Sequence, residues 1–358
     1  MQNLINQQSP KKNYDFIDAI RGIAMMSIVA EHCVSAISVD NVYAYGSPKY
    51  WTNLALVQFT KFGTITFFLL AGFLLGDKFT DYSPGQYLKR RVASTFGPWL
   101  FWSLLFSAAV IARWYIKVHI AHPELFTLNS ILGMVAEVYM YSNYWFIINF
   151  LISIGLLLIF RRYLYSIYLG MMLGLFTLFY AINIHYEWVS PRHTTAILGF
   201  VFFLWMGAQL RKHLDVIETW LKNTPYLIIA ALLLFTYVLS LYESSALYHK
   251  SIDPFNSLRF SNVLYSFACF ALLLKIKTFG FIKYLKPRQT TYGIYLIHLI
   301  LIIFLLPKLF GHFNIDVNKF TIIPFLLFNL LNFLLAYGLT FFVVLFISNS
   351  RAKKLVGV

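Results

Sequence analysis

Ten long apolar runs divide this chain, and they constrain its fold more than any other feature. A helix that crosses the hydrocarbon core of a bilayer, about 30 Å thick, needs about 20 mostly apolar residues. The runs that meet or approach this length span residues 16–38, 53–76, 95–118, 144–160, 164–184, 195–210, 225–242, 257–274, 290–309 and 321–347. Only 12% of the residues are charged, whereas a soluble domain has about 25%. The sequence therefore predicts an all-α, multi-pass integral membrane protein of about ten transmembrane helices.

Basic residues are distributed unevenly over the segments that connect these runs. With the N-terminus inside, 19 of the 29 Lys and Arg residues fall in inner segments and 8 in outer ones. This bias follows the positive-inside rule and favours an even number of spans, with both termini in the cytoplasm. We expect one domain over residues 1–358, with cytoplasmic tails at 1–15 and 348–358. We also expect a short interfacial or re-entrant helix at 129–141. No small-residue cleavage site follows the first run, so we expect it to be retained as a helix.

The net charge of +15 does not indicate nucleic-acid binding. The cations form short clusters between apolar runs, and a nucleic-acid footprint would need a basic stripe on a polar face. Such basic loops determine topology and attract anionic membrane lipid. Cys33 and Cys269 both lie within apolar runs, so we predict neither a structural disulfide nor a metal site.

The first apolar run contains four ionisable residues: Asp18, Arg21, Glu31 and His32. Ionisable groups at membrane depth usually face a protein interior or a water-filled cavity. Arg21 and His32 are eleven residues apart, so they share one helical stripe and are separated by about 16 Å along the axis. A histidine at that position is a natural general base for a hydroxyl group. In the alternative interpretation, Asp18 and Arg21 form an interfacial ion pair and His32 only packs between helices.

Two later runs also carry polar groups at membrane depth. Lys61 precedes the segment 63–73 in the second run and needs a partner, for which Glu31 is a candidate by depth alone. A purely structural salt bridge is the alternative to a functional role. In the ninth run, Tyr295 and His298 are three residues apart and share a helical face. A packing hydrogen bond and a catalytic role are both open for this pair.

Three adjacent cations, Lys89, Arg90 and Arg91, stand in the expected loop before the third long helix. Such a triplet is often only a topology signal. At a cytoplasmic helix mouth, however, it would also suit a polyphosphate ligand.

Together these motifs resemble acyltransferase family 3, a family of membrane O-acyltransferases. The matching features, in order, are the Asp18-x-x-Arg21-Gly22 opening, His32 at the family's spacing from Arg21, the segment 67–73, the segment 202–207, and Tyr295 with His298. Two positions depart from the family pattern. Ser94 stands where a second arginine often follows Arg91, and Ala71 replaces the usual serine before Gly72.

The resemblance implies transfer of an acyl group, usually acetyl, from cytoplasmic acyl-CoA to a hydroxyl of a carbohydrate or lipid-linked glycan. It implies His32 as the general base, with Glu31 and Arg21 in the catalytic group. It implies donor binding by Arg21, Lys89, Arg90 and Arg91, with Asp18, Lys61, Tyr295 and His298 in support. Acyl-CoA would be a co-substrate, and no bound cofactor or metal is expected. We expect a protein of the bacterial cytoplasmic membrane without a fused hydrolase-like domain.

Two other classes of function remain open from the residues. A transporter or flippase for a polysaccharide or small organic acid would also need charged residues in the membrane, and interrupted helices in matching halves would favour it. A non-catalytic scaffold would not need the histidine and lysine at that depth. The oligomeric state, the acceptor and the acyl chain length cannot be predicted from the sequence.

Overall fold

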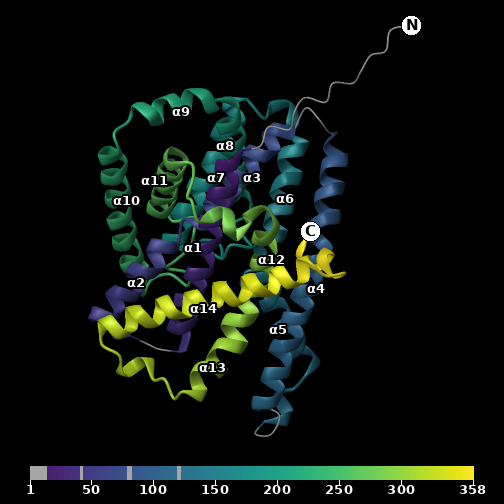
Figure 1. Cartoon of the computed structure of the whole chain (residues 1–358), viewed down its shortest axis with the longest axis vertical. Coiled ribbons are helices and arrows are strands. Elements are labelled where there is room, and N and C mark those ends of the chain that lie inside the picture. The colour runs from purple at the N-terminus through teal and green to yellow at the C-terminus, as the bar shows by residue number, and fades with distance from the viewer. Residues whose placement is uncertain (1–13, 41–42, 79–82, 119–121) are drawn as a thin grey trace.

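The computed structural model describes residues 14–40, 43–78, 83–118 and 122–358. This part of the chain is helical and contains no strand, which confirms the all-α class (Figure 1). Most of the expected N-terminal tail, 1–15, lies outside the described residues. The α-helices are α1 (Asp15–Asp40), α2 (Pro48–Thr60), α3 (Gly63–Lys78), α4 (Pro84–Val118), α5 (Leu128–Tyr141), α6 (Trp145–Ile159), α7 (Ile167–Tyr186), α8 (Ile197–Lys212), α9 (Leu214–Asn223), α10 (Tyr226–Leu247), α11 (Phe260–Ile276), α12 (Pro287–Ile300), α13 (Leu306–His312) and α14 (Ile322–Ser348).

Each of the ten apolar runs coincides with a helix or a pair of helices, but not every helix is long enough to cross a bilayer. Within the described residues, seven helical stretches are long and apolar enough, and an eighth is added if α5 and α6, bent by 57°, count as one span. The expected short helix at 129–141 is α5. Helix α8 has 16 residues and α11 has 17. The chain is therefore multi-pass, and the count of ten stays a prediction.

Helix α8 packs closely against α3 and also contacts α6 and α7. A Cβ atom on Gly72 would lie 1.9 Å from the carbonyl oxygen of Leu204, and one on Gly207 would lie 2.1 Å from that of Leu69. Small residues allow membrane helices to approach at backbone distance. The two glycine-containing segments seen in the sequence, 67–73 and 202–207, therefore face each other across one helix contact.

The second expected run, 53–76, is interrupted where it carries its charge. Helix α2 ends at Thr60, α3 begins at Gly63, and Lys61 lies in the break with its amide bonded to the carbonyl of Gln58. The ninth run also departs from a regular helix, because Leu301–Leu305 form a π-helical stretch between α12 and α13. Interruptions of this kind often occur at functional sites.

One expectation about the third run needs correction. The basic triplet Lys89-Arg90-Arg91 lies within α4, which begins at Pro84, and not in a loop before it. Within the expected C-terminal tail, 348–358, residues 353–356 form a 3₁₀ turn in which Val356 is fully buried; the cytoplasmic location of this tail stays a prediction. Trp102 of α4 donates its indole N–H to the carbonyl of Leu355 at 2.8 Å. The C-terminus consequently lies beside α4 and α12 (Figure 1).

Candidate active site

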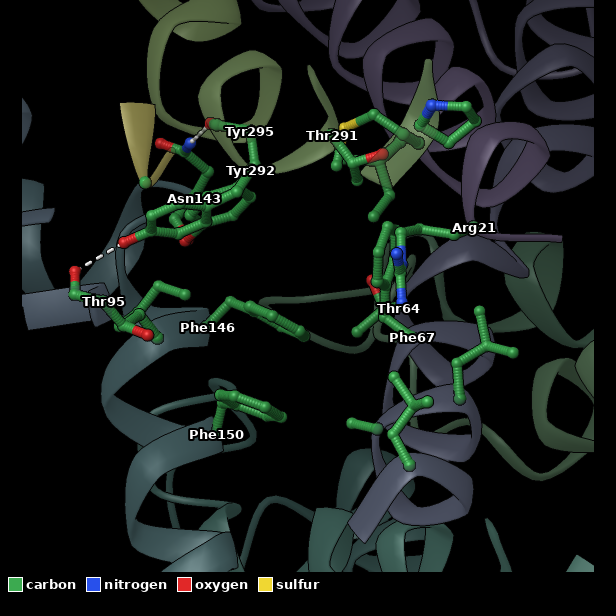
Figure 2. Close-up of a pocket in the computed structure, with 18 of the residues that line it drawn as sticks. Arg21, Thr64, Phe67, Thr95, Asn143, Phe146, Phe150, Thr291, Tyr292 and Tyr295 are labelled. Carbon is green, nitrogen blue, oxygen red and sulfur yellow. Dashed lines mark hydrogen bonds between the residues drawn. The ribbon is translucent and has the colours of Figure 1, made fainter. Parts of the chain in front are cut away.

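A cavity of about 330 Å³ lies between α1, α3, α4, α6 and α12, and Gly357, the residue before the C-terminus, also lines it. Figure 2 shows Arg21 reaching into it from α1, with Thr64 and Phe67 of α3 on the same side. Phe146 and Phe150 of α6 face them from the opposite wall. Aromatic side chains therefore stand on both walls of the cavity, among aliphatic and polar residues.

Three arginines border this cavity: Arg21, Arg91 and Arg288. Asp18 holds two of them, with one carboxylate oxygen 2.9 Å from Arg21 and the other 3.0 Å from Arg288. Arg91 donates through Nε to the hydroxyl of Tyr87 at 3.2 Å. Because arginine binds phosphate oxygens in a bidentate manner, this cluster forms a site suited to a polyphosphate.

Arg288 lies in the first turn of α12, whereas Arg21 and Arg91 lie about two turns into α1 and α4. Within the basic triplet of α4, only Arg91 borders the cavity, and Lys89 and Arg90 are exposed on the helix surface. Consecutive helical residues point about 100° apart, so one helix cannot direct all three cations into the same space. Ser94, three residues after Arg91, also borders the cavity.

His32 borders the cavity and pairs with His298 behind it. Nδ1 of His32 lies 2.7 Å from Nε2 of His298. The ring centroids are 5.0 Å apart and the planes differ by 11°, so the two nitrogens meet edge to edge. Nδ1 of His298 lies 2.9 Å from the carbonyl oxygen of Ile294. His298 is fully buried, whereas His32 is partly exposed to the cavity.

This chain of contacts determines the hydrogen positions of two neutral imidazoles. A carbonyl oxygen only accepts, so Nδ1 of His298 carries the hydrogen and Nε2 of His298 is the acceptor. The hydrogen between the rings then belongs to Nδ1 of His32, and Nε2 of His32 keeps its lone pair. The geometry thus selects the tautomer of His32 that has a basic nitrogen available.

Comparison with known proteins agrees with this arrangement. A family model described as an acyltransferase domain, Acyl_transf_3, matches residues 14–349. The chain belongs to acyltransferase family 3. The comparison with curated proteins found no match, and neither did the comparison with solved structures.

In this acyltransferase, Glu31 and Lys61 form the buried pair expected from their depth. Oε1 of Glu31 and Nζ of Lys61 are 2.5 Å apart, and both residues are less than one-tenth exposed. Glu31 borders the cavity, and Lys61 holds it from the break between α2 and α3. Removal of either partner would leave an uncompensated charge in the protein interior, which is strongly destabilising. The pairing is confirmed, and a catalytic role for either residue stays a prediction.

Tyr295 of the acyltransferase borders the cavity and is held by Asn143. The Tyr295 hydroxyl donates to the carbonyl of Asn143 at 2.5 Å, and the Asn143 side chain donates to the carbonyl of Tyr295 at 2.9 Å. Figure 2 shows the second of these bonds, and also the one from the Tyr292 hydroxyl to the carbonyl of Thr95. These bonds tie α12 to α4 and to the start of α6. Tyr295 therefore positions the wall of the cavity beside the histidine pair.

The structure adds Arg288 to the residues expected at the acyltransferase site. Its position in sequence, next to Pro287, indicates only a basic residue at a helix start, and the contact with Asp18 depends on how α12 packs against α1. In the described part of the chain, no group of three His, Cys, Asp or Glu side chains could hold a metal ion.

Proposed function

We propose that this acyltransferase transfers an acyl group, most simply acetyl, from cytoplasmic acyl-CoA to a hydroxyl of a carbohydrate or lipid-linked glycan. The observation that supports this proposal is His32, paired with His298 behind it, on the wall of a cavity that three arginines also border. The arginines offer a site for the phosphates of CoA, and His32 offers a base about 16 Å further along α1. The apolar residues that line the cavity between them, Met25, Ile28, Phe67 and Phe146 among them, suit the pantetheine arm.

The proposed reaction uses Nε2 of His32 as the general base. It takes the proton of the acceptor hydroxyl while the oxygen attacks the thioester carbonyl carbon. The tetrahedral intermediate collapses, the carbon–sulfur bond breaks, and the CoA thiolate leaves with the proton returned by His32. The products are the acylated acceptor and CoA. His298 keeps His32 in the reactive tautomer throughout, and the Glu31–Lys61 pair keeps the local charge balanced.

The proposal places the protein in a bacterial cytoplasmic membrane with ten spans and both termini inside. The cation bias of the sequence supports that orientation. In this orientation Arg21 stands near the cytoplasmic surface and His32 in the outer half of the membrane. A cytoplasmic donor and an acceptor on the outer side can then meet in one cavity.

The experiment incubates purified protein with acetyl-CoA labelled in the acetyl group and with a glycan fraction from the source membrane. Label on the glycan, together with release of free CoA, is the expected result. The variant His32→Ala should lose about 10²- to 10⁴-fold in rate, the usual contribution of a general base. His312→Ala removes an exposed histidine of α13 and serves as the control. A well-folded His32→Ala protein with normal transfer would contradict the mechanism, and transport without acylation would contradict the function.

A further inference from the structure

Trp145, the first residue of α6, is the only tryptophan that borders the cavity in the described part of the chain. It lies just after the bend between α5 and α6. Its indole stacks on the ring of His193, with centroids 4.5 Å apart and planes 19° apart, and also contacts the ring of Phe200 at 5.4 Å. The ring is thus supported on its protein side while its residue borders the cavity.

His193 is itself held firmly in the loop between α7 and α8. The backbone N–H of Ser257 donates to Nε2 of His193 at 3.3 Å, and Nδ1 lies 3.6 Å from a carboxylate oxygen of Asp253. The side chain of Asn149 donates to the carbonyl of His193 at 3.3 Å. One hydrogen bond to the ring, a carboxylate near its other nitrogen and a hydrogen bond to its backbone carbonyl thus hold His193 in place. The indole of Trp145 is therefore pre-organised and loses little freedom when it binds a ligand.

Trp145 stands at the histidine end of the cavity and not at the arginine end. Asn143, two residues before it, is bonded to Tyr295, which is one turn from His298 on α12. Glu31 directly precedes His32 in α1, and both residues border the cavity together with Trp145. The Glu31 carboxylate therefore belongs to the same end of the cavity as the general base.

A rigid indole and a carboxylate that border the same cavity form a set of groups that suits a sugar. The flat apolar face of an aromatic ring packs against the C–H face of a pyranose, and a carboxylate accepts hydrogen bonds from its hydroxyl groups. A phosphate or an acyl chain would gain little from this combination, because the carboxylate repels the first and is poorly paired with the second. The cavity thus divides into a cationic part and a part suited to a neutral polyol.

We propose that Trp145 is the stacking platform of the acceptor sugar and that Glu31 binds a hydroxyl next to the one that is acylated. This inference rests on the proposed function, because it assigns the acceptor half of the same cavity. The sugar ring lies on the indole, and the reacting hydroxyl is directed to Nε2 of His32. Trp145 is then a specificity-determining residue for the acceptor, and it does not contact the phosphates of the donor.

The test measures initial rates of acetyl transfer against the concentration of membrane glycan and of acetyl-CoA in separate series. Trp145→Ala should raise the KM for glycan about tenfold or more, and it should leave the KM for acetyl-CoA within about twofold. Trp145→Phe keeps an aromatic face and should recover part of the glycan affinity. Trp188→Ala is the matched control, since Trp188 is 61% exposed, stacks on Tyr186 and does not border the cavity.

The outcomes separate this inference from the proposed function. An unchanged KM for glycan in a folded Trp145→Ala protein overturns the platform while transfer by the wild type stands. Equal increases in both KM values also overturn it, because a general distortion of the cavity would produce them. A wild-type protein that transfers label to no glycan overturns both proposals. A selective increase for glycan, partly reversed by Phe, supports the platform.

Discussion

The hydrogen bond between His32 and His298 predicts that mutation of His298 lowers activity, although His298 does not border the cavity. In His298→Ala, Nδ1 of His32 loses the acceptor that lies 2.7 Å away. A buried hydrogen bond of this kind is worth about 1–2 kcal/mol. At about 1.4 kcal/mol for each factor of ten, the reactive tautomer of His32 should become about five- to thirtyfold less populated. We therefore expect kcat to fall by about that factor, with the affinity for CoA unchanged.

The replacement His298→Gln tests the chemical reason for this loss. A glutamine side chain places an amide oxygen near the position of Nε2, and this oxygen can accept the hydrogen from Nδ1 of His32. Activity should therefore be higher for His298→Gln than for His298→Ala. The assay is single-turnover transfer of labelled acetyl, with CoA binding and the melting temperature measured on the same preparations.

A double-mutant cycle completes the test. If His298 acts only through His32, the variant lacking both histidines should transfer acetyl at the rate of His32→Ala alone, because strongly coupled residues are not additive. Independent multiplication of the two losses would refute the reasoning. So would a folded His298→Ala protein with a wild-type kcat, or equal rates for the Ala and Gln variants.

Three further predictions follow from the arginine cluster, the glycine contact and the orientation. Arg288→Ala should weaken CoA binding about tenfold by loss of a charge-assisted contact. Lys89 is an exposed neighbour of Arg91, so Lys89→Ala should change CoA binding little. Isothermal titration with CoA distinguishes the two variants, and equal effects would contradict the role of the arginine cluster. Gly207→Ala should lower the melting temperature, because its Cβ would lie 2.1 Å from a backbone oxygen of α3. Overpacking of this kind costs about 1–3 kcal/mol. An unchanged melting curve would contradict the close contact between α8 and α3. In a cysteine-free background, an impermeant thiol reagent applied to intact cells should label Ser251→Cys and not Ser83→Cys, and the reverse pattern would overturn the proposed topology.

The local features of the site could be predicted because they depend on one helix at a time. The lengths of the apolar runs indicate membrane helices, and an eleven-residue spacing places Arg21 and His32 on one stripe whatever the other helices do. The cost of an isolated charge in lipid requires a partner for Lys61 at similar depth, and Glu31 is that partner. The order of these motifs was also sufficient to indicate the family that residues 14–349 match.

The contacts between distant helices depend on tertiary packing, which no local period encodes. His32 and His298 are separated by 266 residues, and only the approach of α12 to α1 brings their nitrogens together. The same approach adds Arg288 to the donor site through Asp18. The extension of α4 back to Pro84 turns Lys89 and Arg90 away and leaves Arg91 facing the cavity. The sequence by itself determined which groups stand at which depth, and the packing of the helices decided which of them meet.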